Sequence, residues 1–131
     1  MPAPEAVSRP FSYAVVRVVP CVERGERLNV GVVLFCRQHD FLELHVVLDE
    51  ARLAALAPQL DAATLRSRLD LLSRIARGDE EAGALGRLSP SERFGWLVAP
   101  ASSIIQPSEV HTGVTSDPAA TLARLVERLV R

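Results

Sequence analysis

The second half of the chain gathers side chains that could bind an anion. Arg93 precedes a Pro-interrupted segment that carries hydroxyl, imidazole and backbone amide groups at Ser102, Ser103, His111 and Thr112. A guanidinium group together with hydroxyls and backbone amides can cradle a phosphate or another anion. One hypothesis is therefore a small enzyme or sensor for a phosphorylated or anionic ligand. The alternative is that these residues satisfy the backbone polar groups of a long loop.

The same segment holds the residue types of a serine hydrolase. Ser102 or Ser103, His111 and Glu109 lie close together in the sequence. The Gly-x-Ser-x-Gly turn that holds a nucleophile under strain is absent, however, and such residue types recur by chance. We therefore assign no catalytic residue and leave enzymatic activity open, with a binding role favoured.

The metal-ligating residue types follow no usual metal-site pattern. The three histidines, His39, His45 and His111, are scattered without the i, i+4 spacing of a helical site. Cys21 and Cys36 are too few for a usual zinc site. We expect neither a metal nor another cofactor.

Three runs rich in β-branched and aromatic residues predict strands at 11–19, 29–37 and 41–48. Short turns around Gly25 and His39 join them, which indicates an antiparallel three-stranded meander. Phe35 is then expected opposite Leu44, and Val33 opposite Val46. One face of the meander is wholly apolar and should form the core; its residues are Ala14, Val16, Val18, Gly31, Val33, Phe35, Leu42, Leu44, Val46 and Leu48.

The other face of the meander is too apolar for a solvated surface, yet it carries Tyr13, Arg17, Glu43 and His45. Either helices cover it, with the charged groups at its margins, or it is exposed. A large exposed apolar patch with a polar centre marks an interaction site. We therefore predict a non-enzymatic binding module that engages a protein partner through this face, with Tyr13, Arg17 and His45 as contacts.

Helices are predicted at 50–57 and at 61–77, capped by Asp49 and Asp61, and again after Asp117-Pro118. A capping box at 89–92 starts a short helical turn toward Gly95. Residues 78–88 are predicted to be a loop, and 96–99 and 104–105 to add one or two strands. The expected fold class is α+β: an antiparallel sheet begun by the N-terminal meander and packed against about three helices.

Length and composition indicate one soluble domain. The chain has 131 residues, 48% of them hydrophobic, so we expect a flexible leader at 1–10 and a single domain at 11–131. A net charge of −1 argues against nucleic-acid or membrane-surface binding. The basic edge at Arg66, Arg74 and Arg77 is interrupted by Asp70. With no signal peptide and no long apolar run, we expect a cytoplasmic protein.

The predicted meander also separates the two cysteines. Cys21 lies by the first turn and Cys36 at the far end of the ladder, about 25 Å away at the usual strand rise. Disulfide-bonded Cα atoms lie within about 7 Å of each other. We expect no disulfide.

Two segments resemble a known family. They are FSYAVVRVVP (11–20) with ERGERLNVGVVL (23–34), and RFGWLVAP (93–100) running on to VHTG (110–113). In their order, over about residues 11–130, they resemble the bacterial domain of unknown function family 3037. The resemblance implies no established activity. It implies an accessory role, because members are often encoded beside a kinase-like protein resembling HipA, which makes such a kinase a candidate partner.

The resemblance also selects residues. The matching positions are Tyr13, Arg17, Arg24, Gly25, Glu26, Asn29, Gly31, Arg93, Gly95, Trp96, His111 and Gly113. Gly25 and Gly31 have structural explanations, a turn and a close approach of strand backbones. Arg17, Arg93 and His111 have none as good and are the strongest candidates for function. The identity of the partner and any homo-oligomerisation remain open at this point.

Overall fold

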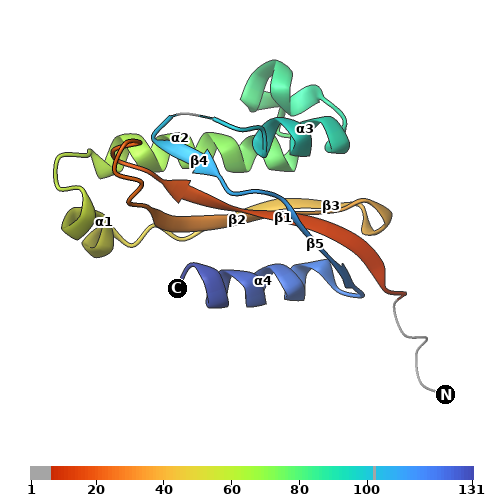
Figure 1. Cartoon of the computed structure of the whole chain (residues 1–131). Helices are drawn as coiled ribbons and strands as arrows, with labels where there is room; N and C mark the ends of the chain where they lie inside the picture. The colour runs from red at the N-terminus through yellow and green to blue at the C-terminus, as the bar shows by residue number, and fades with distance from the viewer. Residues whose placement is uncertain (1–6, 102) are drawn as a thin grey trace.

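A five-stranded antiparallel sheet forms the middle layer of the computed structural model, which describes residues 7–101 and 103–131 (Figure 1). The strands are β1 (Arg9–Val18), β2 (Leu28–Cys36), β3 (Phe41–Val46), β4 (Ile105–Pro107) and β5 (His111–Thr115). β2 lies between β1 and β3, and β4 and β5 both pair with the other edge of β1. β1 is therefore hydrogen-bonded on both sides.

Helices cover both faces of the sheet (Figure 1). One face packs against α1 (Glu50–Leu56), α2 (Ala62–Arg77) and α3 (Pro90–Leu97), and the other packs against α4 (Pro118–Leu129). Two 3-10 helices, η1 (Arg37–His39) and η2 (Glu80–Arg87), lie in the connections. The side chains of Asp49, Asp61, Ser89 and Asp117 accept hydrogen bonds from backbone N–H groups of the first turns of the four α-helices, as N-caps do.

The three-stranded meander is confirmed, with a shifted register between β2 and β3. Val33 pairs with Leu44 and Phe35 with Leu42, two residues from the pairing expected from the sequence. A shift of two residues leaves every side chain on its expected face. The predicted apolar face accordingly forms the main core, where Val33 and Leu44 pack with Leu53, Leu69 and Phe94 from the helices.

A bulge interrupts the β1–β2 pairing. Val16 pairs with Gly31, but the next residue, Arg17, pairs with Asn29, so that Val30 has no opposite residue. One extra residue reverses the facing of the rest of a strand. Val30 therefore joins the main core, and Asn29 lies beside Arg17 on the α4 side.

A second irregularity lies on the other side of β1, at Ser108. Val16 pairs with Pro107 in β4, whereas Tyr13 pairs with His111 in β5, a register change of one residue. Ser108 bridges the change: its Oγ accepts a hydrogen bond from Val15 N at 2.9 Å, and its N–H donates to Val15 O at 2.8 Å. Facing reverses here as well, so β4 contributes to the main core and β5 to the α4 layer.

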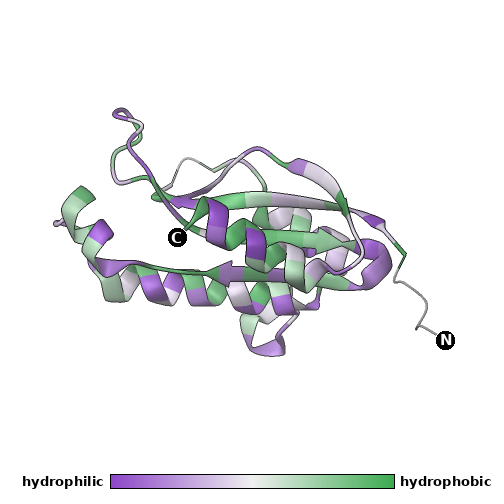
Figure 2. Cartoon of the chain, turned by 90° about the horizontal axis from the view of Figure 1, so that it is seen from below, coloured by the Kyte–Doolittle hydropathy of each residue, from purple (hydrophilic) through white to green (hydrophobic). Residues whose placement is uncertain are grey.

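α4 covers the second face of the sheet, one of the two alternatives that the sequence left open. Val32, Leu34 and Cys36 are fully buried under it, in contact with the apolar stripe of α4 that contains Leu122 and Val126. Figure 2 shows the molecule from this side, with polar and apolar segments alternating along α4 and mostly apolar strands behind it. The centre of this face is therefore interior.

Several expectations about the elements need correction. The described residues contain four α-helices rather than about three, and 80–87 form a 3-10 helix rather than a loop. Trp96 and Leu97 are helical, because the capping box and Pro90 start α3 strongly and nothing ends it before Val98. Within the expected leader, Arg9 and Pro10 already belong to β1, because β5 provides them with a pairing partner; residues 1–6 lie outside the described part.

The cysteines and helices add two observations. Cys21 is exposed in the β1–β2 loop and Cys36 is buried at the far end of β2, both as free thiols. Within residues 7–101 and 103–131, no helix combines the length and hydropathy needed to cross a membrane.

The close approach of β2 and β3 at Gly31 makes a stability prediction. A Cβ at this position would lie 2.9 Å from the backbone oxygen of His45. We expect Gly31→Ala to lower the free energy of unfolding by about 1–3 kcal/mol, because a backbone atom cannot move away easily. The matched control is Gly95→Ala in α3, where a Cβ meets nothing within 4 Å; it should raise stability by up to about 1 kcal/mol. Urea denaturation measures both, and a Gly31→Ala protein as stable as the wild type would contradict the register.

Candidate functional site

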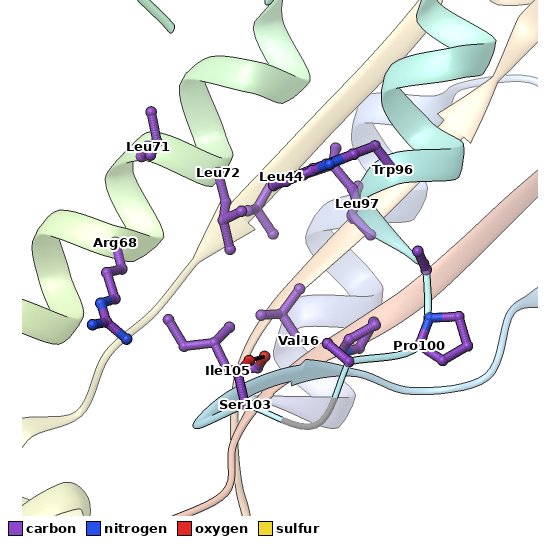
Figure 3. Close-up of a pocket in the computed structure, with 14 residues that line it drawn as sticks. Val16, Leu44, Arg68, Leu71, Leu72, Trp96, Leu97, Pro100, Ser103 and Ile105 are labelled. Carbon is purple, nitrogen blue, oxygen red and sulfur yellow. Dashed lines mark hydrogen bonds between the residues drawn. The ribbon is translucent and has the colours of Figure 1, made fainter. Parts of the chain in front are cut away.

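The main candidate site is a cleft of about 450 Å³ between α2, α3 and β4, which we call the apolar cleft (Figure 3). Its floor is the main-core face of the sheet, represented by Val16, Val33 and Leu44. The walls come from α2, α3, the segment after α3, and β4; they are Arg68, Leu71, Leu72, Trp96, Leu97, Ala99, Pro100, Ala101, Ser103, Ile105 and Pro107. The cleft is thus a part of the core that the helices leave open.

The end of α3 explains why the cleft stays open. Proline has no backbone N–H and disfavours helical conformation in the residue before it, so Pro100 prevents α3 from continuing. The chain leaves the helix at Val98 and crosses to β4, where Val19 N donates a hydrogen bond to Ile104 O at 2.6 Å. This crossing lines one side of the cleft with small and apolar residues.

The rim of the cleft exposes two large apolar side chains. Leu71 is 47% exposed and Trp96 is 44% exposed, whereas the same helices bury Leu65, Leu69, Phe94 and Leu97. Trp96 is the single tryptophan of the chain. Exposed apolar groups that continue into a concave apolar site are typical of binding surfaces, and tryptophan is enriched among the residues that dominate binding energy.

Among the described residues, two polar side chains line the apolar cleft. Ser103 is engaged, because its hydroxyl donates a hydrogen bond to Ile105 O at 2.7 Å. Arg68 extends from α2 at one end of the cleft and, among the described residues, has no carboxylate at ion-pair distance (Figure 3). The arrangement suits an apolar group with a neighbouring negative charge, and no described residue of the lining could act as a base beside Ser103.

The anion cradle expected around Arg93 and His111 is not brought together. Arg93 lies in α3, where its Nη1 donates to Leu88 O at 2.6 Å and its guanidinium lies beside Gly78, at the end of α2. His111 lies in β5, with its ring centroid 5.3 Å from that of Tyr13, which packs with the α4 layer. The two side chains therefore lie in layers on opposite faces of the sheet.

The hydroxyl groups of the expected cradle are also dispersed. Ser103 lines the apolar cleft, on the α2 and α3 side, and Thr112 is exposed in β5, opposite Ser12. Ser102 lies outside the described residues. His111 has Glu109 at 3.8 Å, an exposed pair on the other side of the sheet from Ser103. The sequence did not show that Ser108 reverses the facing of β5, which is the physical reason for this separation.

Tyr13, Arg17 and His45 lie on the sheet face that the sequence predicted for them. Tyr13 stacks on Phe11 with ring centroids 6.0 Å apart, and half-buried His45 pairs with Val32 in the neighbouring strand. α4 occupies the apolar area between these residues. Arg17 remains partly exposed beside the end of α4, where its Nε donates to Asn29 Oδ1 at 3.2 Å. The three residues therefore border α4 and do not surround one open surface.

Sequence reasoning assigned none of the rim residues of the apolar cleft to a site, although Trp96 is among the positions that match the family. Leu71 adjoins the apolar stripe of α2 and breaks its polar side, which is a usable signal of a second contact surface. The sequence predicts a strand at Trp96. That prediction gives no reason to expect an exposed side chain on a helix. Arg68 carries no sequence signal that separates it from the other arginines of α2.

The separation of Arg93 and His111 makes a prediction about coupling. Arg93→Ala leaves the carbonyl of Leu88 without its partner and should cost about 1–3 kcal/mol, whereas His111→Ala loses one exposed aromatic contact of about 0.5–1.5 kcal/mol. Because the side chains share no contact, the double variant should show the sum to within about 0.5 kcal/mol. Chemical denaturation of the four proteins measures the coupling. An interaction energy above about 1 kcal/mol would show that the two residues form one site.

Comparison with known proteins gives one match. The family model described as "Protein of unknown function (DUF3037)" matches residues 13–130, nearly the whole chain. No curated protein and no solved structure matches it. The matched range runs from β1 to the end of α4, so it includes both helical layers and the apolar cleft. The chain belongs to the DUF3037 family.

Proposed function

We propose that this domain is a non-enzymatic binding module whose apolar cleft receives an apolar side chain of a protein partner. The observation that supports the proposal is the exposure of Trp96 and Leu71 at the mouth of a cleft that reaches the main core. Burying such a rim removes apolar surface from water, which stabilises a complex by about 25 cal/mol per Å² before the costs of association.

The chemistry of the partner follows from the charge at the cleft. Arg68 lacks an acidic neighbour among the described residues, so a carboxylate beside the inserted apolar group would complete an ion pair there. Such a pair contributes mainly to specificity and orientation, because Arg68 is exposed. The partner segment therefore combines an aromatic or aliphatic residue with a nearby Asp or Glu.

The apolar cleft lies on the opposite side of the sheet from the face first expected to bind a partner. A partner centred on Tyr13, Arg17 and His45 would have to displace α4, whose stripe covers Val32 and Leu34. Keeping α4 in place retains that buried area, and the apolar cleft is open without any rearrangement. The HipA-like kinase that the family resemblance implies is the first candidate partner.

Site-specific cross-linking in the native host tests where the partner binds. A photoreactive benzoylphenylalanine at position 71 should give a cross-linked product, because this position lies at the mouth of the cleft. The matched control has benzoylphenylalanine in place of Val114, which is 72% exposed in β5 and does not line the apolar cleft. Products from position 114 but not from position 71 would contradict the proposal.

The single tryptophan then provides a direct test with the purified partner. With 5-fluorotryptophan at position 96, the ¹⁹F resonance should shift on addition of the partner, since the ring moves from solvent to an interface. Leu71→Asp and Arg68→Glu should weaken binding about tenfold or more, because they oppose burial and reverse the charge. Arg87→Glu is the control, with the same charge change at an exposed site outside the cleft. Equal binding by all variants would refute the assignment of the surface.

A further inference from the structure

A second cleft, of about 380 Å³, lies at the C-terminal end of α4, on the side of the sheet away from the apolar cleft. In the part of the chain that the structure describes, its charged lining consists of four arginines, Arg17, Arg27, Arg52 and Arg131, and we call it the basic cleft. Its other polar side chain is Asn29. In a chain of net charge −1, this concentration of positive charge is local.

Hydrogen bonds to α4 explain part of the basic cleft. Asn29 Nδ2 donates to Leu129 O at 2.9 Å, and Arg52 Nη1 donates to Val130 O at 3.0 Å. Both satisfy carbonyl groups at the end of the helix, where cations and donors are favourable. Among the described residues, Arg17 and Arg27 donate to no carbonyl group of α4, so direct capping of the helix end does not account for their charges.

Arg17 is oriented but incompletely used. Its Nε donates to Asn29 Oδ1 at 3.2 Å, which ties the guanidinium to the same network that holds α4. In the described part of the chain, the Arg17 side chain makes no other hydrogen bond. Its two Nη groups are therefore available to bind a ligand. A guanidinium fixed through Nε presents its Nη groups as a fork, the geometry that binds phosphate or carboxylate oxygens in a bidentate manner.

Two of the four arginines form no ion pair in the described part of the chain. Arg52 has Asp49 at 3.4 Å, and Arg131 has Glu127 at 3.2 Å. Arg17 and Arg27 have no carboxylate at ion-pair distance among the described residues. Burial is the largest cause that lowers the pKa of Arg17, and repulsion from Arg27 lowers it further. Attraction to Glu109 acts in the opposite direction and raises this pKa. An anion between the two arginines would relieve this repulsion.

We propose that the basic cleft binds a phosphoryl group, with Arg17 and Arg27 as its principal ligands and Arg52 beside them. The charge count favours phosphoryl over carboxylate. A phosphate monoester carries about −1.5 to −2 at pH 7, which matches two unpaired arginines, whereas a carboxylate carries −1. The group belongs either to a phosphorylated protein side chain or to a phosphorylated small molecule, which offer the same chemistry to the cleft.

This inference is independent of the proposed function. The apolar cleft and the basic cleft share no lining residue and lie on opposite faces of the sheet. Phosphoryl binding should therefore leave the ¹⁹F resonance of Trp96 unchanged. Conversely, Arg17→Gln should not alter the response of that resonance to a protein partner.

Titration of the ¹⁵N-labelled full chain followed by NMR tests the inference. Inorganic phosphate should shift the Arg17 Nε–Hε and Asn29 side-chain resonances in a saturable way, and acetate at equal ionic strength should not. Arg17→Gln and Arg27→Gln should each weaken phosphate binding about tenfold, because each removes a charged contact. Arg27 lies in an exposed loop, so its variant keeps the fold if Arg17→Gln does not. Arg87→Gln is the charge-matched control.

Two further probes distinguish the source of the phosphoryl group. Tighter binding of an Ala-phosphoSer-Ala peptide than of glycerol phosphate would indicate a phosphorylated protein, and the reverse order would indicate a small molecule. Equal binding of both would show that the cleft reads the phosphoryl group alone. Indistinguishable shifts with phosphate and acetate, or wild-type affinity in both Arg17→Gln and Arg27→Gln, would overturn the proposal.

Discussion

The sheet is apolar on both faces, and this constraint determines most of the architecture. Val33 and Leu44 on one face, and Val32 and Leu34 on the other, are almost fully buried. A sheet of this kind needs a helical layer on each side, because each face would otherwise leave a large apolar area in water. The helices after β3 provide the first layer, and α4 alone provides the second. The candidate sites arise where these layers end: the apolar cleft where α2 and α3 diverge, and the basic cleft where α4 stops.

Two irregularities beside β1 adjust the sheet to its two layers. The bulge at Val30 turns that residue into the main core and brings Asn29 next to Arg17. The register change at Ser108 lets one passage of chain contribute Ile105 to one layer and Thr115 to the other, where Thr115 Oγ1 lies 2.6 Å from Thr121 Oγ1. Regular pairing would have placed Val30 among the polar groups of the basic cleft. The bulge is therefore part of how that cleft is formed.

Local signals in the sequence were sufficient for most elements and for the faces of the meander. Alternation of apolar residues and the caps at Asp49, Asp61 and Asp117 predicted strands and helices that the structure confirms. The candidate sites were less accessible, because they depend on contacts between distant segments. Asn29 bonds to Leu129, 100 residues away, and nothing near either residue indicates the contact. The expected grouping of Arg93 with His111 failed for the same reason, since one residue at Ser108 decides the side on which His111 lies.

The pairing of β1 with segments from both ends of the chain affects how the protein is made. β1, β2 and β3 leave the ribosome before β4, β5 and α4 emerge. Until then, the edge of β1 that pairs with β4 and β5 has no partner strand, and Val32 and Leu34 are not covered by α4. Contacts this distant in sequence also form slowly. Until α4 emerges, the nascent chain therefore exposes an apolar sheet face. Chaperones and proteases, rather than the stability of the finished fold, decide the fate of products that terminate before α4.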